Sequence, residues 1–150
     1  MSEKIKVAII GCGAIANSAH IPAYMKNEKA EIKYFCDIIP ERADAAVEKY
    51  GCGKAVTDYK EVLADPEIEA ISVCTPNKVH STITIDALKA GKHVLCEKPA
   101  DRLYKQALLM QEAQKKYGKV LNIGVCNRFN TGVNKMKELI DSGRLGEIYQ

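Results

Sequence analysis

The stretch Val7-Ala-Ile-Ile-Gly-Cys-Gly-Ala-Ile-Ala16 guides the interpretation of the whole chain. A short apolar run breaks into glycines and then continues with residues that favour a helix. Its small residues follow the pattern G-x-G-x-x-A, which predicts a strand, a tight turn and a helix. A turn of this kind holds a pyrophosphate on the free N–H groups at the helix start. The motif alone fits an ordinary strand-to-helix turn equally well, so the rest of the sequence must decide.

Each small residue of this turn has a physical reason to be small. Gly11 permits the tight turn, Gly13 lets the backbone approach the phosphates without a Cβ, and Ala16 lets the helix pack closely on the strand. If the turn binds a dinucleotide, its backbone makes the contacts. The predicted contact residues are Gly11, Cys12, Gly13, Ala14 and Ile15.

The composition is that of one globular domain with a substantial core. The chain has 150 residues, 47% of them apolar and 27% charged, with a net charge of +3. This small charge and the absence of a basic stripe argue against nucleic acid or a membrane surface as partner. No apolar run approaches the ~20 residues that span a bilayer, and the N-terminal run is too short for a signal peptide. We therefore expect a cytoplasmic protein.

The six cysteines form no C-x-x-C pair and match no zinc-ribbon spacing. Five of them lie at or just past the end of a predicted strand, so we expect small, semi-buried residues along one sheet edge. We predict neither a metal site nor structural disulfides, since disulfides are rare in a reducing compartment.

Strand-like and helix-like segments alternate along the chain. Predicted strands cover residues 4–10, 31–37, 55–57, 69–75, 92–97 and 119–126, and a further strand begins at 146–150. Predicted helices cover 14–25, 40–50, 59–64, 77–90, 101–117 and 132–142. We expect Pro22 to interrupt the first helix and to restart a short helix through Met25. We expect Asn77 and Asp101 to cap the fourth and fifth helices, and Gly51 and Gly118 to end the second and fifth. This alternation predicts an α/β fold, a doubly wound parallel sheet of the Rossmann type with strand order 3-2-1-4-5-6.

Polar residues collect where the predicted strands end. The ends carry Asp37, Thr75-Pro76-Asn77, Glu97-Lys98-Pro99 and Asn127-Arg128, whereas the strand interiors are apolar. In an open parallel sheet, ligands bind past the carboxyl ends of the strands, near the switch between strands 1 and 4. This clustering favours the dinucleotide interpretation of the glycine turn.

Asp37 lies at the tip of the second strand, 26 residues after Gly11. This position suits a carboxylate that binds the adenosine ribose hydroxyls. It would repel a 2′-phosphate, so we expect NAD rather than NADP. Arg42 is the only nearby cation, and a nearby arginine can reverse such a preference. The alternative is a carboxylate that only caps the following helix.

Lys98 follows the fifth strand between a glutamate and a proline. There its ammonium group can project toward a substrate oxygen and stabilise developing alkoxide charge. The alternative is a solvated surface pair with Glu97. We interpret His20 as a structural residue, whereas His80 lies closer to the predicted crevice and its role is open.

The motifs together resemble the glucose-fructose oxidoreductase / inositol dehydrogenase / rhizopine-catabolism (Gfo/Idh/MocA) family. They are the glycine turn, Asp37, Cys74-Thr-Pro-Asn77 with His80, Ala87-Leu-Lys-Ala-Gly-Lys-His-Val-Leu-Cys-Glu-Lys-Pro99 and Arg128-Phe129. The resemblance implies a nicotinamide-dependent oxidoreductase of sugars, cyclitols or similar polyols. It implies that Lys98 takes part in catalysis and in placing the nicotinamide. It also implies that the cofactor crevice is lined by Thr75, Pro76, Asn77, His80 and Glu97, to which we add Asn127.

Members of this family are usually more than twice as long. Their second domain supplies much of the substrate site and the dimer interface. We therefore divide the chain into a dinucleotide-binding domain (1–127) and a connecting helix with the first strand of a second domain (128–150). We expect a piece of a longer homo-oligomeric protein, inactive by itself; a naturally short protein is the alternative. A non-catalytic dinucleotide- or sugar-sensing regulator and a redox-neutral NAD-dependent sugar-processing enzyme remain open as other functions.

Overall fold

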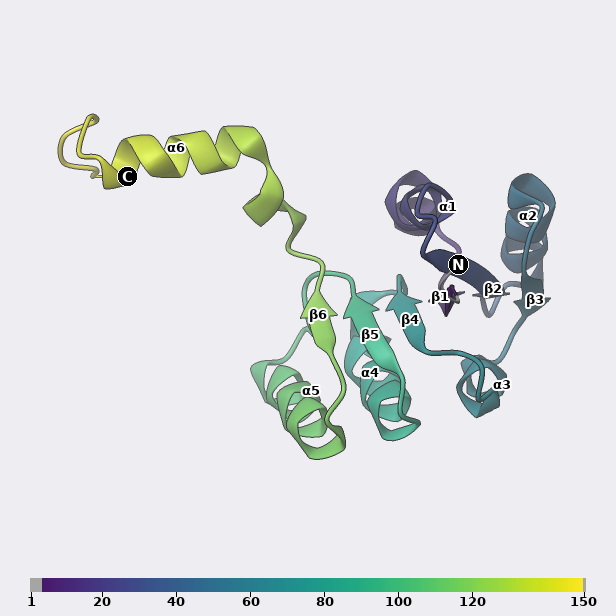
Figure 1. Cartoon of the computed structure of the whole chain (residues 1–150). Helices are drawn as coiled ribbons and strands as arrows, with labels where there is room; N and C mark the ends of the chain where they lie inside the picture. Colours follow the sequence, from purple (N-terminus) through teal and green to yellow (C-terminus); the bar gives the residue numbers. More distant parts are fainter. Residues whose placement is uncertain (1–3, 150) are drawn as a thin grey trace.

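Six parallel strands form a single sheet in the order β3-β2-β1-β4-β5-β6. The computed structural model describes residues 4–149, and helices cover both faces of the sheet (Figure 1). The strands are β1 (Ile5–Ile10), β2 (Ala30–Cys36), β3 (Lys54–Val56), β4 (Ala70–Val73), β5 (His93–Cys96) and β6 (Leu121–Ile123). The helices are η1 (Ala16–His20), α1 (Ile21–Met25), α2 (Pro40–Tyr50), α3 (Tyr59–Ala64), η2 (Asn77–Val79), α4 (His80–Lys89), α5 (Tyr104–Tyr117), η3 (Cys126–Phe129) and α6 (Thr131–Asp141). The predicted fold class and strand order are confirmed.

Both faces of the central strand β1 are buried, which explains its continuous apolar sequence. Val7 and Ile9 pack in the core beneath α1 and α2, whereas Ala8 and Ile10 pack in the core that α3, α4 and α5 cover. Successive side chains of a strand point to opposite faces, so one apolar run supplies both cores. β1 pairs with β2 on one side and with β4 on the other.

The chain is helical without a gap from Ala14 to Met25, but a new α-helical segment, α1, starts at Ile21 and runs through Met25 with Pro22 in its first turn, as predicted. Within this helix, Ala16–His20 forms a π turn in which the Ile21 N–H donates to the Ala16 carbonyl, five residues back. The wider turn places Pro22 at the start of the next α-helical stretch, where its missing N–H costs little.

Two predicted helix caps are wrong. Asn77 makes no side-chain capping bond and opens a 3₁₀ turn, so α4 begins only at His80. Asp101 lies before α5, which begins at Tyr104, and its carboxylate accepts the N–H groups of Ser81 and Leu103. Asp101 therefore ties the loop before α5 to the first turn of α4. Gly51 and Gly118 end α2 and α5 as predicted, and both are left-handed, with φ of 65° and 64°.

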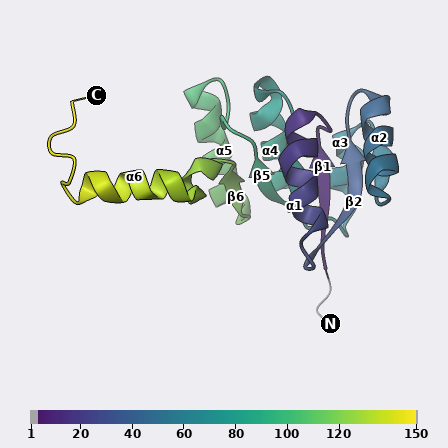
Figure 2. The same ribbon diagram turned by 90° about the horizontal axis from the view of Figure 1, so that it is seen from above.

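Helix α6 extends away from the sheet in both views (Figures 1 and 2). The strand predicted after it is wrong for Gly146–Tyr149, which have no regular structure apart from a bend at Glu147, while Gln150 lies outside the described residues. A strand needs a neighbour to accept its hydrogen bonds, and no strand of residues 4–149 lies beside this segment.

No helix within residues 4–149 has the length and apolar character needed to cross a lipid bilayer.

Candidate functional site

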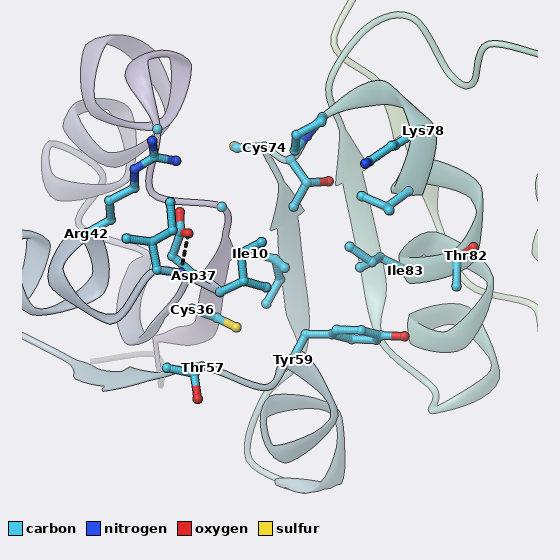
Figure 3. Close-up of a pocket in the computed structure, with 17 residues that line it drawn as sticks. Ile10, Cys36, Asp37, Arg42, Thr57, Tyr59, Cys74, Lys78, Thr82 and Ile83 are labelled. Atoms are coloured by element: carbon cyan, nitrogen blue, oxygen red, sulfur yellow. Dashed lines mark hydrogen bonds between the residues drawn. The ribbon is translucent and has the colours of Figure 1, made fainter.

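A cavity of about 440 Å³ lies at the carboxyl ends of β1 to β4, where the order of the sheet reverses (Figure 3). Five of the predicted site residues line it, namely Gly11, Gly13, Asp37, Thr75 and Pro76. The other lining residues are Ile10, Cys36, Ile38, Ile39, Arg42, Thr57, Tyr59, Cys74, Lys78, Val79, Thr82 and Ile83.

The fold itself requires a glycine at position 11. Its φ is +94°, a conformation that side-chain-bearing residues rarely adopt. A Cβ at this position would lie 2.7 Å from the carbonyl oxygen of Cys74. The ends of β1 and β4 are drawn together because the Cys74 N–H donates to the Ile10 carbonyl at 2.7 Å. A larger residue at Gly11 would force these two strand ends apart.

Gly13 has no such internal reason to be glycine. Its φ is not positive, and a Cβ built there meets no atom of the described chain within 4 Å. The Asn17 side-chain amide holds this loop by donating to the carbonyls of Cys12 and Gly13 at 2.9 and 3.1 Å. The exposed residues Ala14 and Ile15 then start the helix, whose first-turn N–H groups have no intrahelical acceptor. The space beside Gly13 therefore fits an anionic ligand.

The Asp37 carboxylate joins β2 to the glycine turn. Its side chain is buried, with Oδ2 accepting the Cys12 N–H at 2.9 Å and Oδ1 accepting the Ile39 N–H at 3.0 Å. Asp37 thus does more than cap α2, because one bond crosses to the turn after β1. A carboxylate oxygen has two lone pairs, so both oxygens keep room for ligand hydroxyl groups.

Several lining residues were missed by the sequence prediction. Thr57 follows β3 and Lys78 follows β4, so the rule of carboxyl strand ends could have found both. Tyr59 forms one wall in Figure 3, and its hydroxyl donates to Asp86 Oδ2 on α4 at 2.7 Å. Burial and this bond raise the pKa of Tyr59 to about 12, so the phenol stays neutral. Thr82 and Ile83 belong to no motif.

Glu97, Lys98 and Asn127 do not line this cavity. Glu97 and Lys98 follow β5, and Asn127 lies in η3 after β6. They therefore lie further along the same edge of the sheet, as predicted from the strand ends. Lys98 and Asn127 are exposed, whereas Glu97 is partly buried.

Asn77 and His80 do not line this cavity. Asn77 is exposed. The His80 ring is fully buried, with Nδ1 2.8 Å from the Pro99 carbonyl and Nε2 2.8 Å from the Thr75 carbonyl. His80 thus bridges the loops that follow β4 and β5. Cys12 is likewise buried behind the turn and contributes its backbone N–H to Asp37.

Five of the cysteines lie at or just past the end of a strand, as predicted, Cys52 lies between α2 and β3, and all six are free thiols. Burial raises the pKa of Cys12, Cys36 and Cys74 to about 12 and that of Cys96 to about 11. These four thiols are therefore protonated at neutral pH and are poor nucleophiles. Within the described part of the chain, no three metal-ligating side chains cluster.

Comparison with known families identifies a match over residues 5–125. The matching model is GFO_IDH_MocA, described as an oxidoreductase family with an NAD-binding Rossmann fold. The chain is 37% identical to D-glucoside 3-dehydrogenase of Escherichia coli over 148 residues, which are 99% of this chain and 42% of that protein. It is 33% identical to inositol 2-dehydrogenase of Salmonella typhimurium, covering 95% of this chain and 43% of that protein.

Solved structures agree with this match. The WlbA dehydrogenase from Chromobacterium violaceum, in complex with NADH and UDP-GlcNAcA, superposes with a TM-score of 0.89 at 34% identity and covers 99% of this chain. The 3-ketoreductase KijD10 from Actinomadura kijaniata, in complex with NADP and TDP-benzene, gives 0.87 at 28% identity and covers 94%. In both cases the match spans 43% of the relative.

The chain spans less than half the length of these relatives, and the shared part contains the glycine turn and the cavity beside it. Its extent coincides with the NAD-binding module of the matching family model. This chain therefore belongs to the Gfo/Idh/MocA oxidoreductase family and comprises the family's NAD(P)-binding Rossmann domain.

Proposed function

We propose that this chain is the cofactor-binding part of an NAD-dependent dehydrogenase of sugars, cyclitols or related polyols. The observation that carries the proposal is the contrast between the two glycines of the turn. Gly11 is glycine because the fold requires it, whereas the space beside Gly13 is open. A backbone kept bare beside a helix start suits the pyrophosphate of a dinucleotide.

The adenosine half of the cofactor fits the described cavity. The Asp37 carboxylate would accept bonds from the ribose hydroxyls, while Ile38 and Tyr59 offer apolar surface to the base. Ile38 is 88% exposed, which is unusual for isoleucine and suits a side chain that a ligand covers. These contacts leave the nicotinamide half toward the ends of β5 and β6, on the side of Lys98 and Asn127.

We propose NAD as the preferred cofactor because a buried carboxylate at Asp37 would repel a 2′-phosphate. Arg42 lines the same cavity and is the one feature that would favour NADP. The relatives include a structure with NADH and another with NADP. The balance between Asp37 and Arg42 therefore decides the preference.

Lys98 is the proposed catalytic residue. The bound cofactor supplies hydride acceptance or donation at the nicotinamide. The exposed Lys98 ammonium group would donate a hydrogen bond to the substrate oxygen and stabilise the negative charge that develops there. The named relatives act on a glucoside or an inositol, which supports a polyol substrate. The ordered Glu97-Lys98 segment favours an enzyme over a non-catalytic sensor.

Isothermal titration calorimetry of the chain with NADH and NADPH tests this proposal. We expect NADH to bind at least about tenfold more tightly, and Asp37→Ser to narrow that ratio. Arg42→Ala is the matched control, which should weaken only NADPH. Absence of binding by either dinucleotide would reject the function, and tighter NADPH binding would reject the role of Asp37. We expect little turnover of simple sugars by this chain alone.

A further inference from the structure

His20 occupies a buried position that the proposed function does not explain. It lies on the π turn η1, inside the helix that begins at the glycine turn. Its side chain is 7% exposed and contacts Ser72 within β4 and Glu97 just after β5. A buried imidazole needs partners for both ring nitrogens.

Both nitrogens of His20 have such partners. Nδ1 lies 2.7 Å from the Ser72 hydroxyl on β4, and Nε2 lies 2.9 Å from Glu97 Oε1. The Glu97 side chain is only 14% exposed, and its other oxygen, Oε2, accepts the backbone N–H of Lys98 at 3.0 Å. One carboxylate thus connects the His20 ring to the backbone of Lys98.

The chemistry of these partners assigns the imidazole tautomer. An ionised carboxylate only accepts hydrogen bonds, so Nε2 of His20 carries the proton that Glu97 accepts. The Ser72 hydroxyl can then donate to Nδ1. Every link in the path from Ser72 through His20 and Glu97 to Lys98 therefore has a donor and an acceptor.

Gly124 lies beside the Glu97 carboxylate and leaves room for it because a glycine has no side chain. A Cβ at Gly124, just after β6, would lie 3.0 Å from Glu97 Oε1. On the other side of Lys98, the His80 ring faces the carbonyl of Pro99 at 2.8 Å. The segment Glu97–Pro99 is therefore held by a buried histidine at each end.

We propose that His20 is a positioning residue for Lys98. By fixing the Glu97 carboxylate, it fixes the backbone from which the Lys98 side chain projects, and it ties that backbone to the helix of the dinucleotide turn. The proposal rests on the proposed role of Lys98. The geometric part of the proposal is that His20 immobilises the Lys98 N–H through Glu97. This part can be tested without cofactor or substrate.

Amide hydrogen exchange measured by NMR on the intact chain provides the test. His20→Ala should speed exchange of the Lys98 amide at least about tenfold, since it removes the charge-assisted hydrogen bond that holds the Glu97 carboxylate against that amide. His20→Gln, whose side-chain N–H can replace Nε2, should bring the rate back to within about threefold of wild type. Val62→Ala is the control, because Val62 is fully buried in the core beneath α3 to α5 and has no part in the path.

A Lys98 exchange rate that changes no more in His20→Ala than in Val62→Ala would overturn the proposal. Should His20→Ala fail to fold, nitrogen-15 NMR of the wild-type ring decides, because the proposal requires the proton on Nε2 and fails if Nε2 is bare. NADH titration separates this inference from the proposed function. Wild type that protects Lys98 but binds no dinucleotide rejects the function alone, whereas binding without an effect of His20→Ala rejects the positioning role alone.

Discussion

Alanine at Gly13 and alanine at Gly11 should have opposite consequences, although the two residues are separated by one position. At Gly13 the φ is not positive and the added methyl group meets nothing within 4 Å. Alanine there restricts the unfolded chain, which stabilises a protein by about 0.4–1 kcal/mol when the native backbone tolerates it. We therefore expect Gly13→Ala to melt at the wild-type temperature or slightly above it.

The same methyl group should interfere with a bound pyrophosphate. It would occupy the space into which the proposed ligand packs against bare backbone. We expect the affinity for NADH to fall at least about tenfold, equivalent to about 1.4 kcal/mol. The variant would thus keep its stability and lose its ligand.

Gly11→Ala should instead lose stability, because the added methyl group strains the fold itself. A residue with a Cβ at a φ of +94° costs about 1–2 kcal/mol, and the 2.7 Å contact with the Cys74 carbonyl adds about 1–3 kcal/mol of overpacking. A loss of about 2–5 kcal/mol lowers the melting temperature of a chain of this size by at least about 5 °C.

Thermal melts and NADH titrations of the two variants, side by side with wild type, provide the assay. Binding by Gly13→Ala within about twofold of wild type would refute the placement of the pyrophosphate beside Gly13. Wild-type melting of Gly11→Ala would refute the explanation of Gly11 as a requirement of the fold.

Three further results are expected. The hydrogen bond from Lys33, together with the Glu67 backbone N–H, lowers the pKa of Asp65 to about 2, so the ionised Asp65 should stabilise the fold fully above about pH 4 and lose this effect as the pH falls toward 2. In urea unfolding across this range, Lys33→Met should lose less free energy of unfolding on acidification than wild type. An aromatic disulfide reagent should titrate the exposed Cys126 and the half-buried Cys52 in the folded chain, and reaction of all six thiols at one rate would contradict the buried positions of the other four. Tyr59→Phe removes the bond to Asp86 and should lower the free energy of unfolding by about 1 kcal/mol, so unchanged urea unfolding would show that the bond contributes nothing.

The sequence by itself determined the elements and their order. Segments bounded by glycine, proline and polar residues predicted the six strands of the sheet, together with a seventh that does not form at residues 146–149. The signal was clearest for β1, whose apolar residues are buried on both faces of the sheet. The left-handed ends of α2 and α5 followed from Gly51 and Gly118, whose conformation is a local matter of backbone sterics. Asp37 and the glycine turn were placed correctly because parallel strands bring their carboxyl ends to one edge.

Local rules were wrong where a residue's partner lies far along the chain. Asp101 predicted a helix cap, but its carboxylate ties Ser81 to the loop before α5. Here a contact with another segment outweighs the intrinsic preference of a single residue.

The tertiary structure alone decided which glycine serves the fold and which leaves space for a ligand, because that distinction depends on the Cys74 carbonyl, which a different strand supplies. It alone brought His20 to Glu97, which lies 77 residues away in the sequence. A hydrogen bond between distant residues leaves no periodicity or motif in the sequence. It exists only because right-handed crossovers return successive strands to the same edge of one sheet.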